Sequence, residues 1–170
     1  KVQPENLELV TTGLQKNMPE SVLINSIPLI SSLNNPTIHE IVEALGAKIL
    51  FGHEYLNNQI GSYSIGAMQL CNYLLHLKEN GLIITPGDRA DIILGALQAN
   101  ESANYPSVSG IVLTGNIIPE DSILKLIEGL SSIVPIITVD GGTYSIANKI
   151  GSIKSKIYPD NLQKIETSIN

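Results

Sequence analysis

The sequence predicts an α/β fold in which a mostly parallel β-sheet is flanked by helices in alternating strand–helix order. Segments with the apolar pattern of buried strands alternate with segments of helical spacing, and the polar links between them are short. The hydrophobic fraction is 43% but the aromatic fraction is only 4%, so Ile, Leu, Val and Ala must form most of the core. This composition is typical of parallel strands that are buried on both faces.

The first 35 residues are expected to form a helix, a strand and a boundary loop. Pro4 suits the first turn of a helix. Apolar residues at helical spacing follow it at Leu7, Leu9, Val10 and Leu14. Residues 22–29 are predicted as a short apolar strand, and the polar residues 31–36 as a loop. We therefore expect a domain boundary here, with residues 1–35 before it and one domain in residues 36–170.

Helices are expected at regular intervals in the second part. Thr37 and Glu40 have the spacing of a capping box, which predicts a helix that begins after Thr37 and ends at Gly46. Helical spacing of apolar residues predicts further helices at residues 70–78, 91–98, 121–130 and 143–150. A turn at residues 158–160 is expected to lead into a short terminal helix that contains Leu162 and Ile165.

Strands are expected between these helices. Runs of aliphatic and β-branched residues predict strands at residues 48–51, 60–68, 82–85, 110–114 and 134–139. Gly61 and Gly66 weaken the second of these strands, whereas Pro135 suits the first residues of the last one. Strands and helices that alternate over short links are expected to form one parallel sheet with right-handed crossovers.

The charge and the cysteine content exclude several classes of function. Sixteen acidic and ten basic residues give a net charge of −6 at pH 7. Without a basic stripe, we expect neither a nucleic acid nor a membrane surface as partner. No apolar run approaches the ~18–20 residues of a membrane span. The single cysteine, Cys71, predicts a reducing, cytoplasmic location, and Lys1 in place of Met predicts a segment of a longer polypeptide.

Small and polar residues gather after three of the predicted strands, and these strand ends form the candidate site. Ligands of open parallel sheets bind beyond the carboxyl ends of the strands, and the ends of adjacent strands converge at one edge. The candidate ligand-binding or interface residues are Thr85, Gly87, Asp88, Arg89, Thr114, Gly115, Asn116, Asp140, Gly141 and Gly142.

Arg89, the only arginine, has two interpretations. Next to the N-terminus of a helix, its five N–H donors and fixed charge would bind an anion or a nucleotide. Alternatively, Asp88 caps the following helix, and Arg89 pairs with a carboxylate such as Asp91 or across a subunit interface. The residue types alone leave both interpretations open.

We expect no metal ion, no cofactor and no catalytic residue in this chain. The sequence contains neither a phosphate-binding GxxxxGK[ST] loop nor a GxGxxG motif that opens a helix. His39, His53 and His76 lack a second ligand at metal-binding spacing. Cys71 lies at an apolar helix start, where a buried and inert thiol is expected. An independent enzyme that uses Cys71 or a histidine is the weakest hypothesis.

Two segments resemble the DRTGG domain, a family named after an Asp-Arg pair followed by Thr-Gly-Gly. Asp88 and Arg89 match the first pair, and Thr114 and Gly115 match the next two residues. Asn116 replaces the last Gly, and because Asn tolerates a left-handed backbone, we expect the turn to survive. The similarity extends over about residues 36–150.

The resemblance implies a function through the proteins that carry this domain. The DRTGG domain is typically the middle module of long bacterial phosphate acetyltransferases. There it lies between an N-terminal P-loop domain similar to dethiobiotin synthetase and a C-terminal catalytic domain. Residues 1–35 would then be the tail of the upstream domain or a linker. The parent enzyme would convert acetyl-CoA and phosphate into acetyl phosphate and CoA, with the catalytic residues in the C-terminal domain.

On this basis we expect a non-catalytic regulatory and oligomerisation module of a phosphate acetyltransferase. Its partners would be the neighbouring domains of its own polypeptide, further copies in a dimer or higher oligomer, and a small effector such as pyruvate or NADH. The alternative is a standalone metabolite or nucleotide sensor, similar to the DRTGG domains joined to CBS domains. In that case Arg89 would bind a phosphate group.

Overall fold

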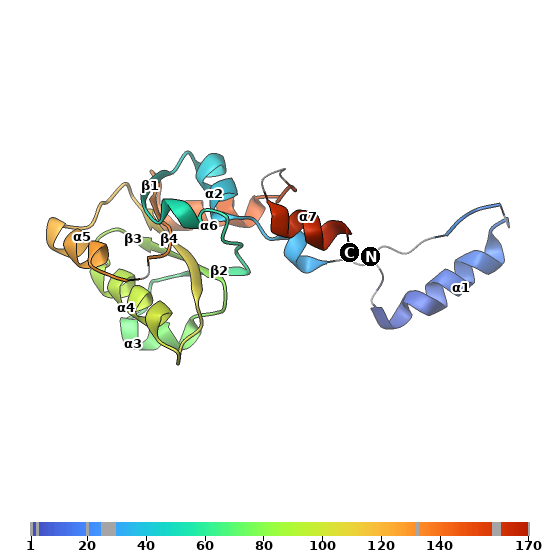
Figure 1. The fold of residues 1–170 in the computed structure, drawn as a ribbon, viewed down its shortest axis with the longest axis horizontal. Coiled ribbons are helices and arrows are strands. Elements are labelled where there is room, and N and C mark those ends of the chain that lie inside the picture. The colour runs from blue at the N-terminus through green and yellow to red at the C-terminus, as the bar shows by residue number, and fades with distance from the viewer. Residues whose placement is uncertain are drawn as a thin grey trace. The chain divides into compact units, whose positions relative to one another are not determined.

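A five-stranded, mostly parallel sheet forms the centre of Ser31–Asn170, as the sequence predicts (Figure 1). Its strand order is β1-β5-β4-β3-β2. Strands β2, β3, β4 and β5 run parallel, whereas β1 pairs antiparallel with β5. The strands are β1 (Lys48–Phe51), β2 (Ser62–Ile65), β3 (Gly81–Pro86), β4 (Val108–Thr114) and β5 (Ile136–Thr138).

The structure is a computed structural model that describes residues 2, 4–19, 21–24, 30–131, 133–157 and 161–169. It contains two compact units, Lys1–Ile30 and Ser31–Asn170. Among the described residues, no helix is long and apolar enough to span a membrane.

The first unit contains the predicted N-terminal helix, but its described residues do not form the strand that was expected after it. Helix α1 (Leu7–Asn17) is present, and none of its residues is buried. The strand predicted at residues 22–29 is wrong for residues 22–24, while residues 25–29 lie outside the described residues. A strand is stable only in a ladder with a neighbour, and the described part of this unit contains no strand with which residues 22–24 could pair.

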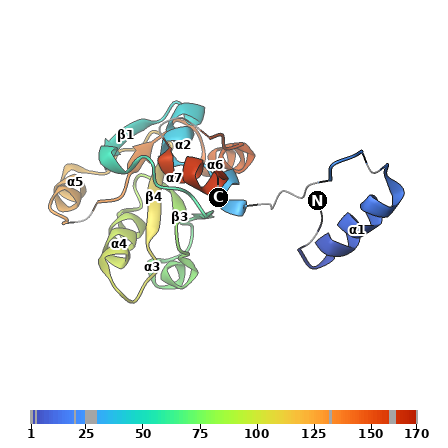
Figure 2. The ribbon, with the colours of Figure 1, turned by 45° about the vertical axis from the view of Figure 1, so that its right-hand side comes forward.

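In the second unit, helices cover both faces of the sheet, as Figure 1 and Figure 2 show. Successive residues of a strand point to opposite faces. On β3, Ile83 therefore joins one core cluster, whereas Leu82 and Ile84 join the other. The first cluster packs against α3 (Leu70–Tyr73), α4 (Ala90–Glu101) and α5 (Asp121–Glu128), and the second against α2 (Ile38–Leu45) and α6 (Thr143–Ser152). The aliphatic composition is thus explained by a sheet buried on both sides.

The predicted capping box and the predicted terminal helix are both present. The Glu40 N–H donates to Thr37 Oγ1 at 3.2 Å, and the Thr37 N–H donates to Glu40 Oε2 at 2.8 Å. Gly46 ends α2 with a left-handed φ of 61°. The terminal helix is α7 (Leu162–Ile169), and the turn predicted at residues 158–160 lies outside the described residues.

In the second unit, the largest differences from the prediction lie at three elements. Strand β2 is shorter than residues 60–68, because the Ile60 N–H before it donates to the Pro36 carbonyl and the Ala67 N–H after it turns back to the Ile65 carbonyl, both at 2.9 Å. The helix predicted at residues 70–78 is one α-helical turn followed by the 3₁₀-helix η4 (Leu74–His76), because the chain must turn back through Asn80, with φ of 53°, to enter β3. The loop predicted at residues 31–36 contains the 3₁₀-helix η2 (Ser31–Asn34).

Candidate functional site

The three candidate strand ends converge at one edge of the sheet. Strands β3, β4 and β5 are neighbours and run parallel, so their carboxyl ends lie together. The Gly115 N–H donates to the Gly141 carbonyl at 2.9 Å, and the Asn116 N–H donates to the Val139 carbonyl at 2.9 Å. The turns that follow β4 and β5 are therefore joined directly by backbone hydrogen bonds.

A hydroxyl pair and three left-handed residues fix the shape of these two turns. The hydroxyl groups of Thr114 and Thr143 hydrogen-bond at 2.8 Å, which connects the end of β4 to the start of α6. Gly115, Asn116 and Gly141 have φ values of 79°, 53° and 127°. Asn116 thus adopts the left-handed conformation expected of it, and the turn survives without the third residue being Gly.

Gly87 allows the turn after β3 to touch the loop after β4. A Cβ atom at Gly87 would lie 1.8 Å from the carbonyl oxygen of Ile117, a distance at which any side chain would force the two segments apart. All three turns are thus in contact with a neighbouring turn, and Gly87 is required for packing.

Arg89 braces the end of β2 against the start of α4. Its Nε and Nη2 groups donate to the two carboxylate oxygens of Asp91, each at 2.8 Å. Nη2 also donates to the Met68 carbonyl at 2.8 Å, and Nη1 donates to the Gly66 carbonyl at 3.2 Å. Four of the five N–H groups of a guanidinium are therefore used within the chain. The hydrogen bonds from Arg89 lower the pKa of the Asp91 carboxyl below its ordinary value.

Of the remaining polar candidates, one is buried and two are exposed. Thr85 is buried, and its hydroxyl donates to the Gly66 carbonyl at 3.4 Å. Asp88 and Asp140 are exposed. The expectation that Asp88 caps α4 is wrong, because Arg89 occupies the N-cap position and its side chain makes no capping hydrogen bond. The pairing of Arg89 with Asp91, one of the two interpretations, is confirmed.

Three cavities in the described part of the chain lie away from the strand-end turns. One lies between α2 and α6, one at the amino ends of β3 and β4, and one beside β2. None of the candidate residues lines any of these three cavities.

Residues 40–153 match the family model described as the DRTGG domain. The chain belongs to the DRTGG domain family. The phosphate acetyltransferase of Nitratidesulfovibrio vulgaris is 38% identical over 154 residues, which are 90% of this chain and 22% of that protein. The phosphate acetyltransferase of Synechocystis sp. is 37% identical over 171 residues, which are 99% of this chain and 24% of that protein. The chain spans about a quarter of the length of these curated relatives.

A solved structure of another DRTGG domain has a similar fold. It contains the CBS and DRTGG domains of the regulatory region of Clostridium perfringens pyrophosphatase, complexed with its activator diadenosine tetraphosphate. The TM-score is 0.53 at 18% identity, and the match covers 88% of this chain and 65% of that chain. At this level of identity the likeness shows the fold alone.

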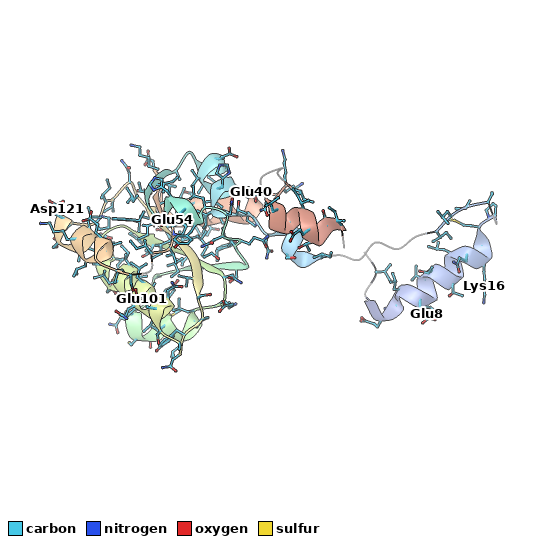
Figure 3. The ribbon with its side chains drawn as sticks, in the orientation of Figure 1. Glu8, Lys16, Glu40, Glu54, Glu101 and Asp121 are labelled. Atoms are coloured by element: carbon cyan, nitrogen blue, oxygen red, sulfur yellow. The ribbon has the colours of Figure 1, made fainter. Side chains whose placement is uncertain are left out.

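Sequence reasoning missed a polar network around Glu40, a residue of α2 that is labelled in Figure 3. The Lys164 ammonium group of α7 donates to Glu40 Oε2 at 3.1 Å, with the two side chains 0% and 5% exposed. Ser155 Oγ donates to both carboxylate oxygens at 3.0 Å, and the Lys156 N–H donates to Oε1 at 2.8 Å. Lys164 also contacts Ser155 Oγ. Only the local part of this network, the capping box with Thr37, had a sequence signal.

The network controls the ionisation of Glu40. Burial by itself would raise the pKa of this carboxyl group. Hydrogen bonds from the backbone of Lys156 and Thr37, and from the side chains of Lys164 and Ser155, outweigh that effect and lower the pKa below its ordinary value of 4.5. Glu40 is therefore charged in the folded state and is matched by the cationic Lys164.

Cys71 is exposed, which corrects the expectation of a buried thiol. Helix α3 is a single turn that directs Tyr73 into the core, so Cys71 lies on its solvent side. Among the described residues, no group of three or more His, Cys, Asp or Glu side chains is arranged to hold a metal ion.

Arg89 and Asp88 provide a test of whether the family motif is structural. We expect Arg89→Ala to lower the free energy of unfolding by about 1–2 kcal/mol, because the carbonyls of Gly66 and Met68 lose a charged donor at a partly exposed site. Asp88→Asn, at the neighbouring exposed position, should change it by less than about 0.5 kcal/mol. Urea unfolding followed by circular dichroism measures both. Equal stability of Arg89→Ala and the parent chain would contradict the bracing role.

Alanine variants of Gly87 and Gly142 test whether the turns pack closely at Gly87. Gly87→Ala should destabilise the fold by at least about 3 kcal/mol, because its Cβ overlaps the Ile117 backbone. Gly142 has a φ of −72° and no atom within 4 Å of an added Cβ, so Gly142→Ala should cost less than about 1 kcal/mol. Thermal unfolding of the two variants compares them directly. Similar melting temperatures would show that the turns are not in contact at Gly87.

The depressed pKa of Glu40 predicts a loss of stability in acid. Because the folded-state pKa is below 4.5, the unfolded chain binds the proton first, and the stabilisation is lost as the pH falls from about 4.5 through the folded-state pKa. Glu40→Gln should reduce stability at pH 7 and flatten this part of the pH profile. Glu43→Gln, an exposed carboxylate on the same helix, should keep the parent profile. Unfolding free energies measured from pH 3 to 7 would contradict the account if all three profiles had the same shape.

Proposed function

We propose that this DRTGG domain is a non-catalytic regulatory and assembly module of a phosphate acetyltransferase. The parent enzyme would convert acetyl-CoA and phosphate into acetyl phosphate and CoA in a separate catalytic domain. The observation that carries the proposal is the alignment with phosphate acetyltransferases. It covers 90–99% of this chain but only 22–24% of each of the two enzymes, so the chain corresponds to one part of a larger catalyst.

The geometry of the strand-end turns supports a role other than catalysis. A catalytic group must be free to reach a substrate. Arg89, the most distinctive residue of the motif, instead uses four N–H groups to hold Gly66, Met68 and Asp91. Gly87 packs so closely against the Ile117 backbone that no side chain fits between them. In the proposal, these residues stabilise the carboxyl edge of the sheet, and neighbouring domains dock against this edge.

Exposed apolar side chains support the proposed partners. On α1, Leu7, Leu9, Val10 and Leu14 are exposed, as suits a closing helix of an upstream P-loop domain to which residues 1–35 would belong. On the edge strand β2 and just after it, Tyr63, Ile65 and Met68 are 37–45% exposed, and we assign this edge to contacts with neighbouring domains or a second copy of the chain. The proposal places the assembly in the cytoplasm, where the exposed thiol of Cys71 stays reduced.

A standalone sensor is the second candidate function. It is favoured by the similarity in fold to a regulatory region that contains CBS and DRTGG domains. This candidate requires a native polypeptide close to the size of this chain. It also requires Arg89 to exchange its internal hydrogen bonds for a ligand, which the four contacts of the guanidinium oppose.

Removal of the module from its native polypeptide tests the proposed function. The native polypeptide and a version without residues 36–170 would be compared for acetyl transfer, for particle size, and for the response to pyruvate and NADH. We expect acetyl transfer to persist in the shortened protein, while the effector response and the larger assembly are lost. The purified chain of 170 residues should show no acetyl transfer above background. Acetyl transfer by this chain alone, or an unchanged effector response after deletion, would contradict the proposal.

A further inference from the structure

A cavity of about 550 Å³ opens between the C-terminal ends of α2 and α6 and the segment that follows α6. Its charged lining residues are Glu40, Glu43, Lys149, Lys154 and Lys156. The volume lies within the range of about 300–1,000 Å³ that is typical of small-molecule sites. No residue of the family motif lines this cavity.

Three lysines with free ammonium groups meet at this cavity. In the described part of the chain, ion pairs involve Arg89 and Lys164, and none involves Lys149, Lys154 or Lys156. All three side chains are exposed. Three of the ten basic residues of a chain with net charge −6 therefore line one cavity, which makes it a local reversal of the overall charge.

The helix ends do not account for all of this positive charge. The C-terminal turns of α2 and α6 each carry roughly half a negative charge. Glu43 adds one full negative charge, and Lys149 lies in the last turn of α6, where a lysine offsets the dipole of its own helix. Lys154 and Lys156 lie beyond the end of α6. Because the two helix ends and Glu43 together offset roughly two of the three lysine charges, roughly one positive charge remains without compensation.

Glu40 lines the cavity without repelling an anion. Its carboxylate is neutralised by Lys164 and is occupied by hydrogen bonds from Ser155 and Lys156. Glu40 therefore adds no uncompensated negative charge to the cavity lining.

We propose that this cavity binds a small molecule that carries a phosphate group, held by Lys149, Lys154 and Lys156. Lysine is a compact point charge on a flexible stem, and it binds phosphate oxygens with charge-assisted hydrogen bonds. The cavity has room for the organic part of a sugar phosphate or nucleotide beside the phosphate itself. The biological role of this site as an effector site rests on the proposed regulatory function, but the binding itself does not.

Binding at this cavity would be coupled to the docking of α7. The Lys156 N–H donates to Glu40, and the Lys156 carbonyl accepts a hydrogen bond from Lys164 at 3.4 Å. A phosphate held by the side chains of Lys154 and Lys156 restrains the same short segment that holds Lys164. The ligand therefore stabilises the attachment of α7 to the rest of the domain.

Titration of the purified full chain with inorganic pyrophosphate tests the binding. Calorimetry should show saturable binding, and amide chemical-shift changes should concentrate at residues 43–46 and 149–157. The double variant Lys154→Gln/Lys156→Gln should weaken binding by at least about tenfold, because two charge-assisted contacts are removed. Glu43→Gln should strengthen it by about two- to threefold, because a like charge is removed from the cavity.

A matched variant separates a specific site from general charge. Lys78→Gln/Lys125→Gln removes the same two charges at exposed positions that do not line the cavity and should alter binding by less than about twofold. The proposal is overturned if pyrophosphate shows no saturable binding below about 10 mM, if both double variants weaken binding equally, or if the shift changes gather around Arg89. Each of these results would leave the deletion experiment on acetyl transfer unaffected, so failure of the site and failure of the proposed function can be told apart.

Discussion

The carboxylate of Glu40 is the group on which three separate stretches of the DRTGG domain depend. It caps the start of α2 through Thr37, holds the backbone after α6 through Lys156, and binds the ammonium group of Lys164 on α7. A buried charge is tolerated only when it is paired and fully hydrogen-bonded, so these contacts must form together. Helix α7 depends on this pair in particular, since Leu162 and Ile169 are 69% and 78% exposed while Lys164 is 1% exposed.

Local and topological features could be predicted from the sequence. The capping box could be read from Thr37 and Glu40 because both partners lie within one helical turn. The convergence of the turns at Gly87, Asn116 and Gly141 followed from the rule that parallel strands share a carboxyl edge. Long-range features could not be predicted. Lys164 lies 124 residues from Glu40, and nothing in the spacing of either residue indicates the other. The solvent-facing position of Cys71 likewise depends on α3 being a single turn that directs Tyr73 inward.

The structure changes the meaning of the family motif in this chain. The residue types left open whether Arg89 binds a ligand or pairs within the chain, and in the structure its guanidinium braces the end of β2 against the start of α4. Conversely, Lys149, Lys154 and Lys156 lie outside the motif and have no ion pair among the described residues. In our account the motif residues stabilise the fold. The proposed effector site lies elsewhere, between the C-terminal ends of α2 and α6 and next to the Glu40 network. Regulation would then act through α7 and the segment before it.

The central claim is that this chain is one module of a larger acetyl-transferring enzyme, and the intact mass of the native polypeptide in its source cells tests it most directly. Mass spectrometry of the protein purified with an antibody against this chain would give that value. The account predicts a mass several times 18.3 kDa, since the chain corresponds to 22–24% of the phosphate acetyltransferases that it resembles. A native mass close to 18.3 kDa would contradict the account and favour the standalone sensor.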